Sequence, residues 1–166
     1  YSRIGLGPKG TIKPDLASYG GELLLGDNGQ MIMKGVKSFS RNGNIASSSG
    51  TSFATARISS LATIIYQNIC KDFKDFSDFN PTLLKALIIH SAKNTDRNLS
   101  MEEIGYGIPA TSTEILSYLK NKNIKIFNGV MEKNKEFDLD ASFFKFKKDM
   151  KVKITLVYDT EFDYLQ

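Results

Sequence analysis

Apolar residues recur at helical spacing in the first two thirds of the chain, and each such stretch carries helix-boundary signals. The longest predicted helix begins at or just after Ser52 and continues to about Cys70, because its apolar residues repeat every three or four positions. A second helix is predicted after Asn80, a good N-cap, with Pro81 at its first helical position. This second helix is expected to end near Ala92.

Shorter patterns predict a hairpin before these helices and one more helix after them. Residues 22–25 and 31–36 flank Gly26-Asp27-Asn28-Gly29, whose residues tolerate the positive φ of a tight turn. Residues 38–50 are small and polar, so we expect a surface loop there. The third helix is predicted over residues 112–120, where Thr113 and Glu114 suit a first turn.

The pattern changes at about residue 122. Residues 124–127 and 152–158 are rich in β-branched and aromatic side chains and therefore predict strands. We expect two domains: a helix-rich portion over residues 1–121 and a β-rich C-terminal extension over residues 122–166. Few residues follow the last predicted strand, so the extension is expected to be truncated.

The composition is that of an ordinary globular protein. Hydrophobic residues make up 41% of the 166 residues and charged residues 24%, which excludes a disordered or fibrous chain. The net charge of +4 comes without a one-sided basic patch, so no nucleic-acid partner is expected. The sequence contains no run of about 18 apolar residues, so no membrane span is predicted. The single cysteine, Cys70, excludes an internal disulfide and is expected to be a buried thiol on an apolar helix face.

The stretch that indicates chemistry is Ser49-Gly50-Thr51-Ser52-Phe53-Ala54-Thr55-Ala56, a turn of small residues that leads directly into the long helix. A serine there lies where free backbone N–H groups and the helix dipole favour an anion on a bound acyl group. Gly50 allows a substrate to approach the backbone closely. The alternative is that Ser52 only caps the helix, which from these residues alone is the commoner case.

Four motifs in order resemble the subtilase family of serine peptidases. Gly50-Thr51-Ser52-Phe53-Ala54 resembles the nucleophile signature G-T-S-x-A, and Lys13-Pro14-Asp15 followed by Gly20-Gly21 is similar to the K-P-D motif with its glycine turn. Residues 80–92 resemble the helix that follows the nucleophile, and Gly105-Tyr106-Gly107 resembles the G-x-G before the last helix. On this resemblance, residues 1–121 are identified as the C-terminal part of a subtilase catalytic domain.

The resemblance implies an α/β fold: the C-terminal portion of a subtilisin-like three-layer fold with a parallel sheet, followed by the start of the β-rich extension. It implies a serine endopeptidase in which Ser52 is the nucleophile and its backbone N–H helps form the oxyanion hole. Gly50, Thr51 and Ala54 are the supporting motif residues. The family's aspartate, histidine and oxyanion-hole asparagine precede the nucleophile and are expected upstream of Tyr1. The alternative function is an inactive subtilase-like binding or scaffold protein.

The implied partners are a protein or peptide substrate and the remaining N-terminal part of the same peptidase. No cofactor is implied, although a structural calcium ion stays open. Ala56 stands where many relatives have proline, a departure with a mild expected effect. The Gly-Pro-rich opening and the hairpin resemble a bacterial branch of the family that is often not secreted. A cytoplasmic location is therefore expected, with secretion as the alternative.

Two ionisable residues could be mistaken for the missing triad members. His90 is the only histidine and sits near the end of a buried helix, where a histidine is tolerated by the helix dipole. We expect it to be packed there, beyond hydrogen-bond reach of Ser52. Asp15 belongs to the K-P-D motif and is expected to form a structural turn.

Two further patterns suggest ligand sites that the surrounding residues disfavour. Residues 5–10 fit G-x-G-x-x-G, but Pro8 and Pro14 forbid the helix that a dinucleotide site requires. The aspartates at 72, 75 and 78 could hold a cation. Lysines and phenylalanines alternate with them, so an exposed face with apolar anchors is the expected arrangement.

Overall fold

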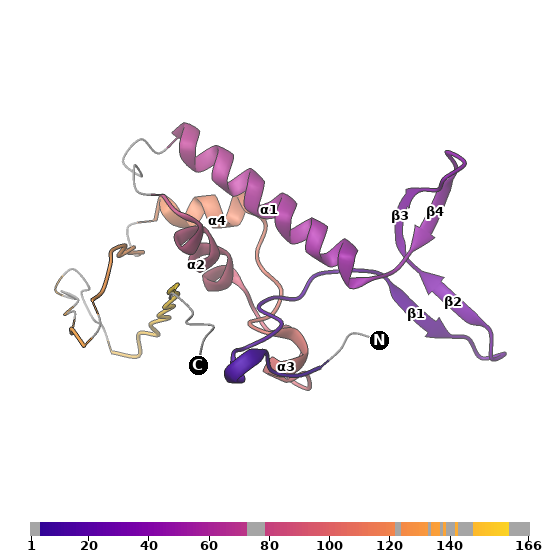
Figure 1. The fold of residues 1–166 in the computed structure, drawn as a ribbon, viewed down its shortest axis with the longest axis horizontal. Coiled ribbons are helices and arrows are strands. Elements are labelled where there is room, and N and C mark those ends of the chain that lie inside the picture. The colour runs from indigo at the N-terminus through magenta and orange to yellow at the C-terminus, as the bar shows by residue number, and fades with distance from the viewer. Residues whose placement is uncertain are drawn as a thin grey trace, which may run out of the picture.

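The structure is a computed structural model, and it describes residues 4–72, 79–121, 124–132, 134–136, 138, 142 and 148–159. In chain order the elements are the 3₁₀ turn η1 (Pro8–Gly10), the strands β1 (Glu22–Leu25), β2 (Met31–Lys34), β3 (Val36–Phe39) and β4 (Ile45–Ser48), and the helices α1 (Thr51–Asp72), α2 (Pro81–Ser91), α3 (Met101–Ile104) and α4 (Ser112–Leu119). Figure 1 shows α2 and α4 beside one half of α1, while both hairpins project from its other end.

The hydrophobic core lies where the second half of α1 packs on α2 and α4. Ile65 and Ile69 are fully buried and cluster with Leu87, Ile88 and Ile115 of the other two helices. Residues four apart share one face of a helix, so Ile65 and Ile69 enter the core together. Burying a side chain of this size stabilises the fold by about 1.5–3 kcal/mol. Within α1, buried residues occur only in this second half.

The helix boundaries agree with the local sequence signals. The predicted long helix is α1, and the helix predicted after Asn80 is α2. The Asn80 side chain accepts a hydrogen bond from the Leu83 N–H at 2.8 Å, and Pro81 occupies the first helical turn. Ala92 follows the last helical residue, and its N–H donates to the Ile89 carbonyl. The third predicted helix is α4.

One short helix was not predicted. The region before the G-x-G motif contains α3. Its first turn is closed by the Glu103 carboxylate, which accepts a hydrogen bond from the Ser100 N–H at 2.7 Å. A Ser-x-x-Glu sequence is a capping signal, but a four-residue helix offers too little apolar periodicity to be recognised.

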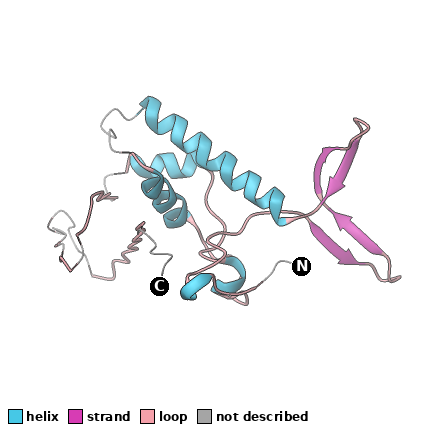
Figure 2. Cartoon of the chain, viewed as in Figure 1, coloured by secondary structure: helices cyan, strands magenta, loops and turns pink. Residues whose placement is uncertain are grey.

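The strands form two antiparallel hairpins (Figure 2). The first is the predicted one: β1 pairs with β2 from Glu22↔Lys34 to Leu25↔Met31, and Gly29 takes a φ of 76° in the turn. The surface loop expected over residues 38–50 is wrong in part, because β3 and β4 pair there. Polar strand residues concealed this hairpin, although Asn-Gly at its turn is a hairpin signal, with a φ of 77° at Gly43.

The expected parallel sheet is not formed by the residues that the structure describes, whose named strands pair only in these hairpins. The two strands predicted over residues 124–127 and 152–158 are also wrong, because neither described segment belongs to a sheet. A strand requires a neighbour that exchanges backbone hydrogen bonds with it. High β-propensity marks a segment that suits a sheet, but it does not supply that neighbour.

The expected burial of Cys70 is also wrong, since the thiol is exposed near the end of α1. The buried stripe of this helix runs through Ile65 and Ile69. One residue further along a helix turns the side chain by about 100°, which carries Cys70 off the stripe.

No described helix is long and apolar enough to cross a membrane.

The cap of α2 provides a test of this fold. We expect Asn80→Ala to lower the free energy of unfolding by about 1 kcal/mol, because the Leu83 N–H loses its acceptor. Asn80→Asp keeps an oxygen at that position and should retain most of the stability. Urea unfolding followed by circular dichroism measures both, with the exposed turn variant Asn98→Ala as the control. An Asn80→Ala protein as stable as Asn98→Ala would contradict the cap.

Candidate active site

Ser52 is the second residue of α1 and is exposed. The first N–H groups of a helix lack intrahelical acceptors and form the positive end of its dipole. Within the described residues the Ser52 hydroxyl forms no hydrogen bond, whereas nearby Thr55 donates its own hydroxyl to the Thr51 carbonyl at 3.0 Å. Ser52 therefore stands at the exposed N-terminal end of the long helix, as the sequence predicted. Its nucleophilic role stays a prediction.

The turn before Ser52 is held by a pair of glycines from the K-P-D region. The Gly50 N–H donates to the Gly20 carbonyl at 2.7 Å, and the Phe53 N–H donates to the Gly50 carbonyl at 3.1 Å. A Cβ atom on Gly20 would lie 2.6 Å from the Gly50 oxygen. Gly21 has a φ of 89°, which an L side chain rarely adopts. Two motifs about 30 residues apart thus meet as bare backbone, and this contact positions the start of α1.

A second junction joins the K-P-D motif to α2. The Asp15 carboxylate is paired with Lys85 at 2.8 Å and also with Lys13. Sequence reasoning assigned Asp15 to a structural turn, and the backbone does bend at residues 13–15. It did not find the partner Lys85, because nothing in the local pattern links two residues 70 positions apart. Asp15 is therefore engaged in an ion-pair junction within the fold.

The G-x-G motif closes the same junction from the other side. The Tyr106 N–H donates to the Asp15 carbonyl at 2.9 Å, and the Ala17 N–H donates to the Gly107 carbonyl at 3.0 Å. A Cβ atom on Gly105 would lie 2.2 Å from the Pro14 carbonyl oxygen. Only glycine permits that approach, so the motif is explained by backbone packing.

The electrostatics of Asp15 favour its charged form. Burial by itself raises the pKa of this carboxyl, but hydrogen bonds from Lys13 and Lys85 and their positive charges outweigh it. The net result is a pKa below the ordinary value of 3.8. A carboxyl with a lowered pKa stabilises the fold above its unfolded-state pKa, and this contribution is lost as the pH falls through the folded-state pKa.

His90 does not contact Ser52. It lies in the last turn of α2, and its ring Nδ1 is 2.9 Å from the Thr155 hydroxyl oxygen. No hydrogen bond joins His90 to Ser52, both of which are described. Burial lowers the pKa of His90 below 6.5, and the positive charge of Lys153 lowers it further. The chain's only histidine is thus engaged at the far end of α2, at a site separate from the candidate nucleophile.

The remaining patterns do not assemble into ligand sites within the described residues. The G-x-G-x-x-G match ends in the three-residue turn η1, so it lacks the helix of a dinucleotide site. Of the three aspartates near the end of α1, only Asp72 is among the described residues; Asp75 and Asp78 lie outside them. Across the described part of the chain, no three metal-ligating side chains gather.

Comparison with known proteins identifies the family. The model of the subtilase family, Peptidase_S8, matches residues 1–107. The match covers more than half of the chain and includes Ser52, both glycine junctions and α2. The chain therefore belongs to the subtilase family, whose members are serine peptidases. No curated protein and no solved structure matches the chain.

The ion pairs of Asp15 predict a pH-dependent effect. At pH 7 we expect Asp15→Asn to lower the free energy of unfolding, since a neutral amide cannot pair with Lys13 and Lys85. The difference from wild type should shrink as the pH falls below about 3.8, where the wild-type carboxyl also becomes neutral. Urea titrations at pH 7 and pH 3 measure it, with exposed Asp27→Asn as the control. A difference that is equal at both pH values would contradict the ion-pair account.

The glycine contact before Ser52 predicts a steric effect. Gly20→Ala places a methyl group 2.6 Å from the Gly50 oxygen and should destabilise the fold by about 1–3 kcal/mol. The matched control is Gly129→Ala, where a methyl group meets nothing within 4 Å. Thermal unfolding compares the two variants. Equal melting temperatures would show that the contact does not constrain the turn.

Proposed function

We propose that the chain is the nucleophile-bearing part of a serine endopeptidase and that Ser52 attacks the substrate's peptide carbonyl. The observation that carries the proposal is the exposed Ser52 hydroxyl in the first turn of α1, within a G-T-S-F-A sequence inside the region matched to the subtilase family. Attack by the Ser52 oxygen forms an acyl-enzyme, which water then hydrolyses.

The start of α1 suits the negative charge that develops during this reaction. A tetrahedral intermediate carries an oxyanion, and free N–H groups at a helix N-terminus stabilise such an anion. The backbone N–H of Ser52 is the donor proposed for the oxyanion. The contact between Gly20 and Gly50 supports its position, because it fixes the backbone immediately before the helix. Thr51 and Ala54 complete the motif without side-chain chemistry of their own.

The general base is proposed to come from polypeptide other than residues 1–166. A serine hydroxyl is a weak nucleophile unless a base removes its proton. The only histidine of the sequence is His90, which binds Thr155 at the end of α2. Asp15 is held by two lysines and serves the fold. The proposed partners are therefore the histidine and aspartate of the remaining peptidase domain, together with a protein or peptide substrate.

The test is covalent labelling of Ser52. We expect a fluorophosphonate probe to label the intact peptidase at Ser52, and Ser52→Ala to abolish both labelling and turnover of an unfolded protein substrate. Loss of a nucleophile of this class lowers kcat by about 10⁶-fold, a value measured on subtilisin itself. The control is Ser60→Ala, which removes another exposed serine of α1 and should change neither readout. Labelling that persists in Ser52→Ala would overturn the assignment.

The 166-residue chain by itself is expected to show no labelling and no turnover, because within the described residues no base is hydrogen-bonded to Ser52. The second candidate function, an inactive binding or scaffold protein of the same family, is favoured by that same lack. The labelling experiment on the intact protein distinguishes the two functions. An intact protein that folds and binds an unfolded substrate, yet is not labelled at Ser52, is the inactive form. Labelling and turnover by the isolated chain would show that a base within it has been overlooked.

A further inference from the structure

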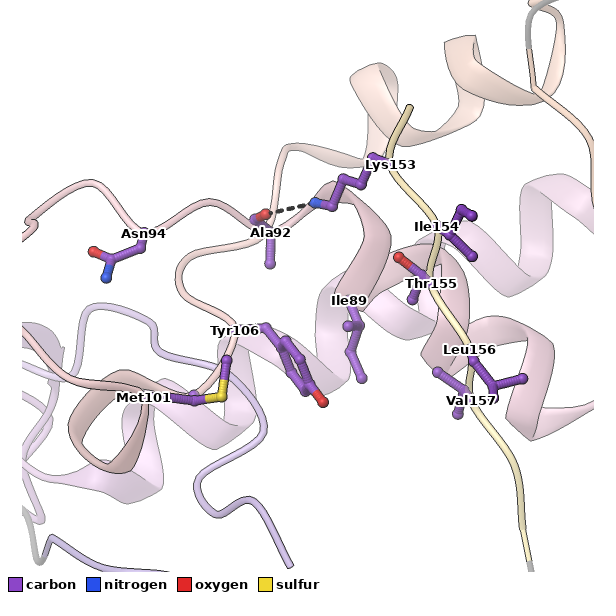
Figure 3. Close-up of a pocket in the computed structure, with 11 residues that line it drawn as sticks. Ile89, Ala92, Asn94, Met101, Tyr106, Lys153, Ile154, Thr155, Leu156 and Val157 are labelled. Carbon is purple, nitrogen blue, oxygen red and sulfur yellow. Dashed lines mark hydrogen bonds between the residues drawn. The ribbon is translucent and has the colours of Figure 1, made fainter. Parts of the chain in front are cut away.

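A segment from the C-terminal extension crosses the end of α2. Residues 152–158, here called the strap, differ in exposure: Thr155 and Val157 are half-buried, while the other five residues are exposed. The exposed apolar and aromatic side chains among them are Val152 at 47%, Ile154 at 84%, Leu156 at 78% and Tyr158 at 74%. Figure 3 shows Lys153 and Thr155 directed toward the end of α2, with Ile154 and Leu156 directed away. The strap therefore has one side that contacts the helix and one side that does not.

Two polar residues hold the strap to the helix. Lys153 Nζ donates hydrogen bonds to the carbonyl oxygens of His90 at 2.5 Å and Ala92 at 3.1 Å. Thr155 Oγ1 lies 2.9 Å from His90 Nδ1. A cation is favourable at this point, because the last carbonyls of a helix lack intrahelical donors and form the negative end of its dipole. Lys153 thus caps α2 from a point 61 residues beyond Ala92.

The contact carries little other support. Among the described residues, the backbone of the strap forms no hydrogen bond with its surroundings, and a pocket of about 420 Å³ remains between it and Ile89, Met101 and Tyr106. A segment held by a few polar bonds over an open pocket gains little free energy from docking. A single change of charge at its contacts is then enough to decide whether it docks.

Such a change is available at His90. The charged group that acts on His90 is Lys153 of the strap, and the one that acts on Lys153 is Lys93 just after α2. The Glu114 carboxylate in the first turn of α4 acts on Lys93, but on neither His90 nor Lys153. Lys85, the other charged residue of α2, is paired with Asp15. Protonation of His90 would therefore place a second positive charge beside Lys153, and among the described residues no carboxylate acts directly on either group. Neutral His90 is compatible with the docked strap, and charged His90 opposes it.

We propose that the strap is a pH-sensitive latch, docked on the end of α2 while His90 is neutral and released when His90 is protonated. The direction of this pH effect agrees with the electrostatics, because burial and the charge of Lys153 lower the pKa of His90 below 6.5 in the docked state. Docking is therefore fully favoured above that value and weakens as the pH falls through the lowered pKa. The latch couples the C-terminal extension to the subtilase portion, and it does not depend on the role of Ser52.

The test measures the position of the strap by electron spin resonance. Spin labels are attached at Cys70, the only cysteine and an exposed one, and at Ile154→Cys, whose side chain points away from α2. At pH 7.5 we expect one narrow distance distribution. At pH 5 we expect a broad one, with a severalfold rise in the released fraction. An unchanged distribution between the two pH values would overturn the latch.

Variants assign the effect to the two residues. In the same labelled chain, His90→Gln should give the narrow distribution at both pH values, because glutamine stays neutral. Lys153→Met should give the broad one at both, whereas Lys153→Arg keeps the cation and should dock at pH 7.5. The control is Lys151→Met, an exposed lysine just before the strap, which should behave as wild type. Release of His90→Gln at pH 5, or of Lys151→Met at pH 7.5, would show that general charge rather than this contact is responsible.

Discussion

The burial of Ile65 and Ile69 against α2 and α4 is the interaction on which the rest of the structure depends. It anchors only the second half of α1, and Ser52 lies 13 residues before Ile65, about 20 Å away along the helix. The hydrophobic core therefore sets the direction of α1 but does not hold its first turn. A candidate nucleophile at that end requires a second anchor, which the backbone contact between Gly20 and Gly50 provides.

The glycine motifs are explained by close approach of backbone to backbone. At Gly20 and at Gly105, a Cβ atom would overlap a carbonyl oxygen of the opposing segment. The first contact fixes the turn before Ser52, and the second fixes the K-P-D segment beside α2, where Asp15 pairs with Lys85. The glycine motifs before and after the nucleophile signature are thus required by the packing of the backbone. This requirement holds whether or not Ser52 reacts.

Helix α2 is the element through which these parts are connected. Asn80 caps its start, Lys85 on its surface binds Asp15, and Leu87 and Ile88 on its buried face enter the core. Its last carbonyl groups accept hydrogen bonds from Lys153. Residues beyond 121 therefore contact both ends of this helix, because the Asn80 side chain at its start also donates a hydrogen bond to the Asn128 side chain. The division of the chain at about residue 121 remains an expectation, and these contacts cross it.

The sequence by itself determined α1, α2, α4, the first hairpin and the place of Ser52 at a helix start, because caps, turn residues and helical periodicity act within a few positions. Tertiary structure decided the partners of Asp15 and His90, the exposure of Cys70 and the second hairpin. It also decided that residues 152–158 lie against a helix rather than in a sheet. The partners of Asp15 and His90 and the place of residues 152–158 depend on which distant segments meet, and strand propensity or a charged side chain cannot specify its partner when 60 or more residues intervene. The second hairpin is local, but its polar strand residues masked the turn signal, and the exposure of Cys70 depends on which face of α1 meets the other helices.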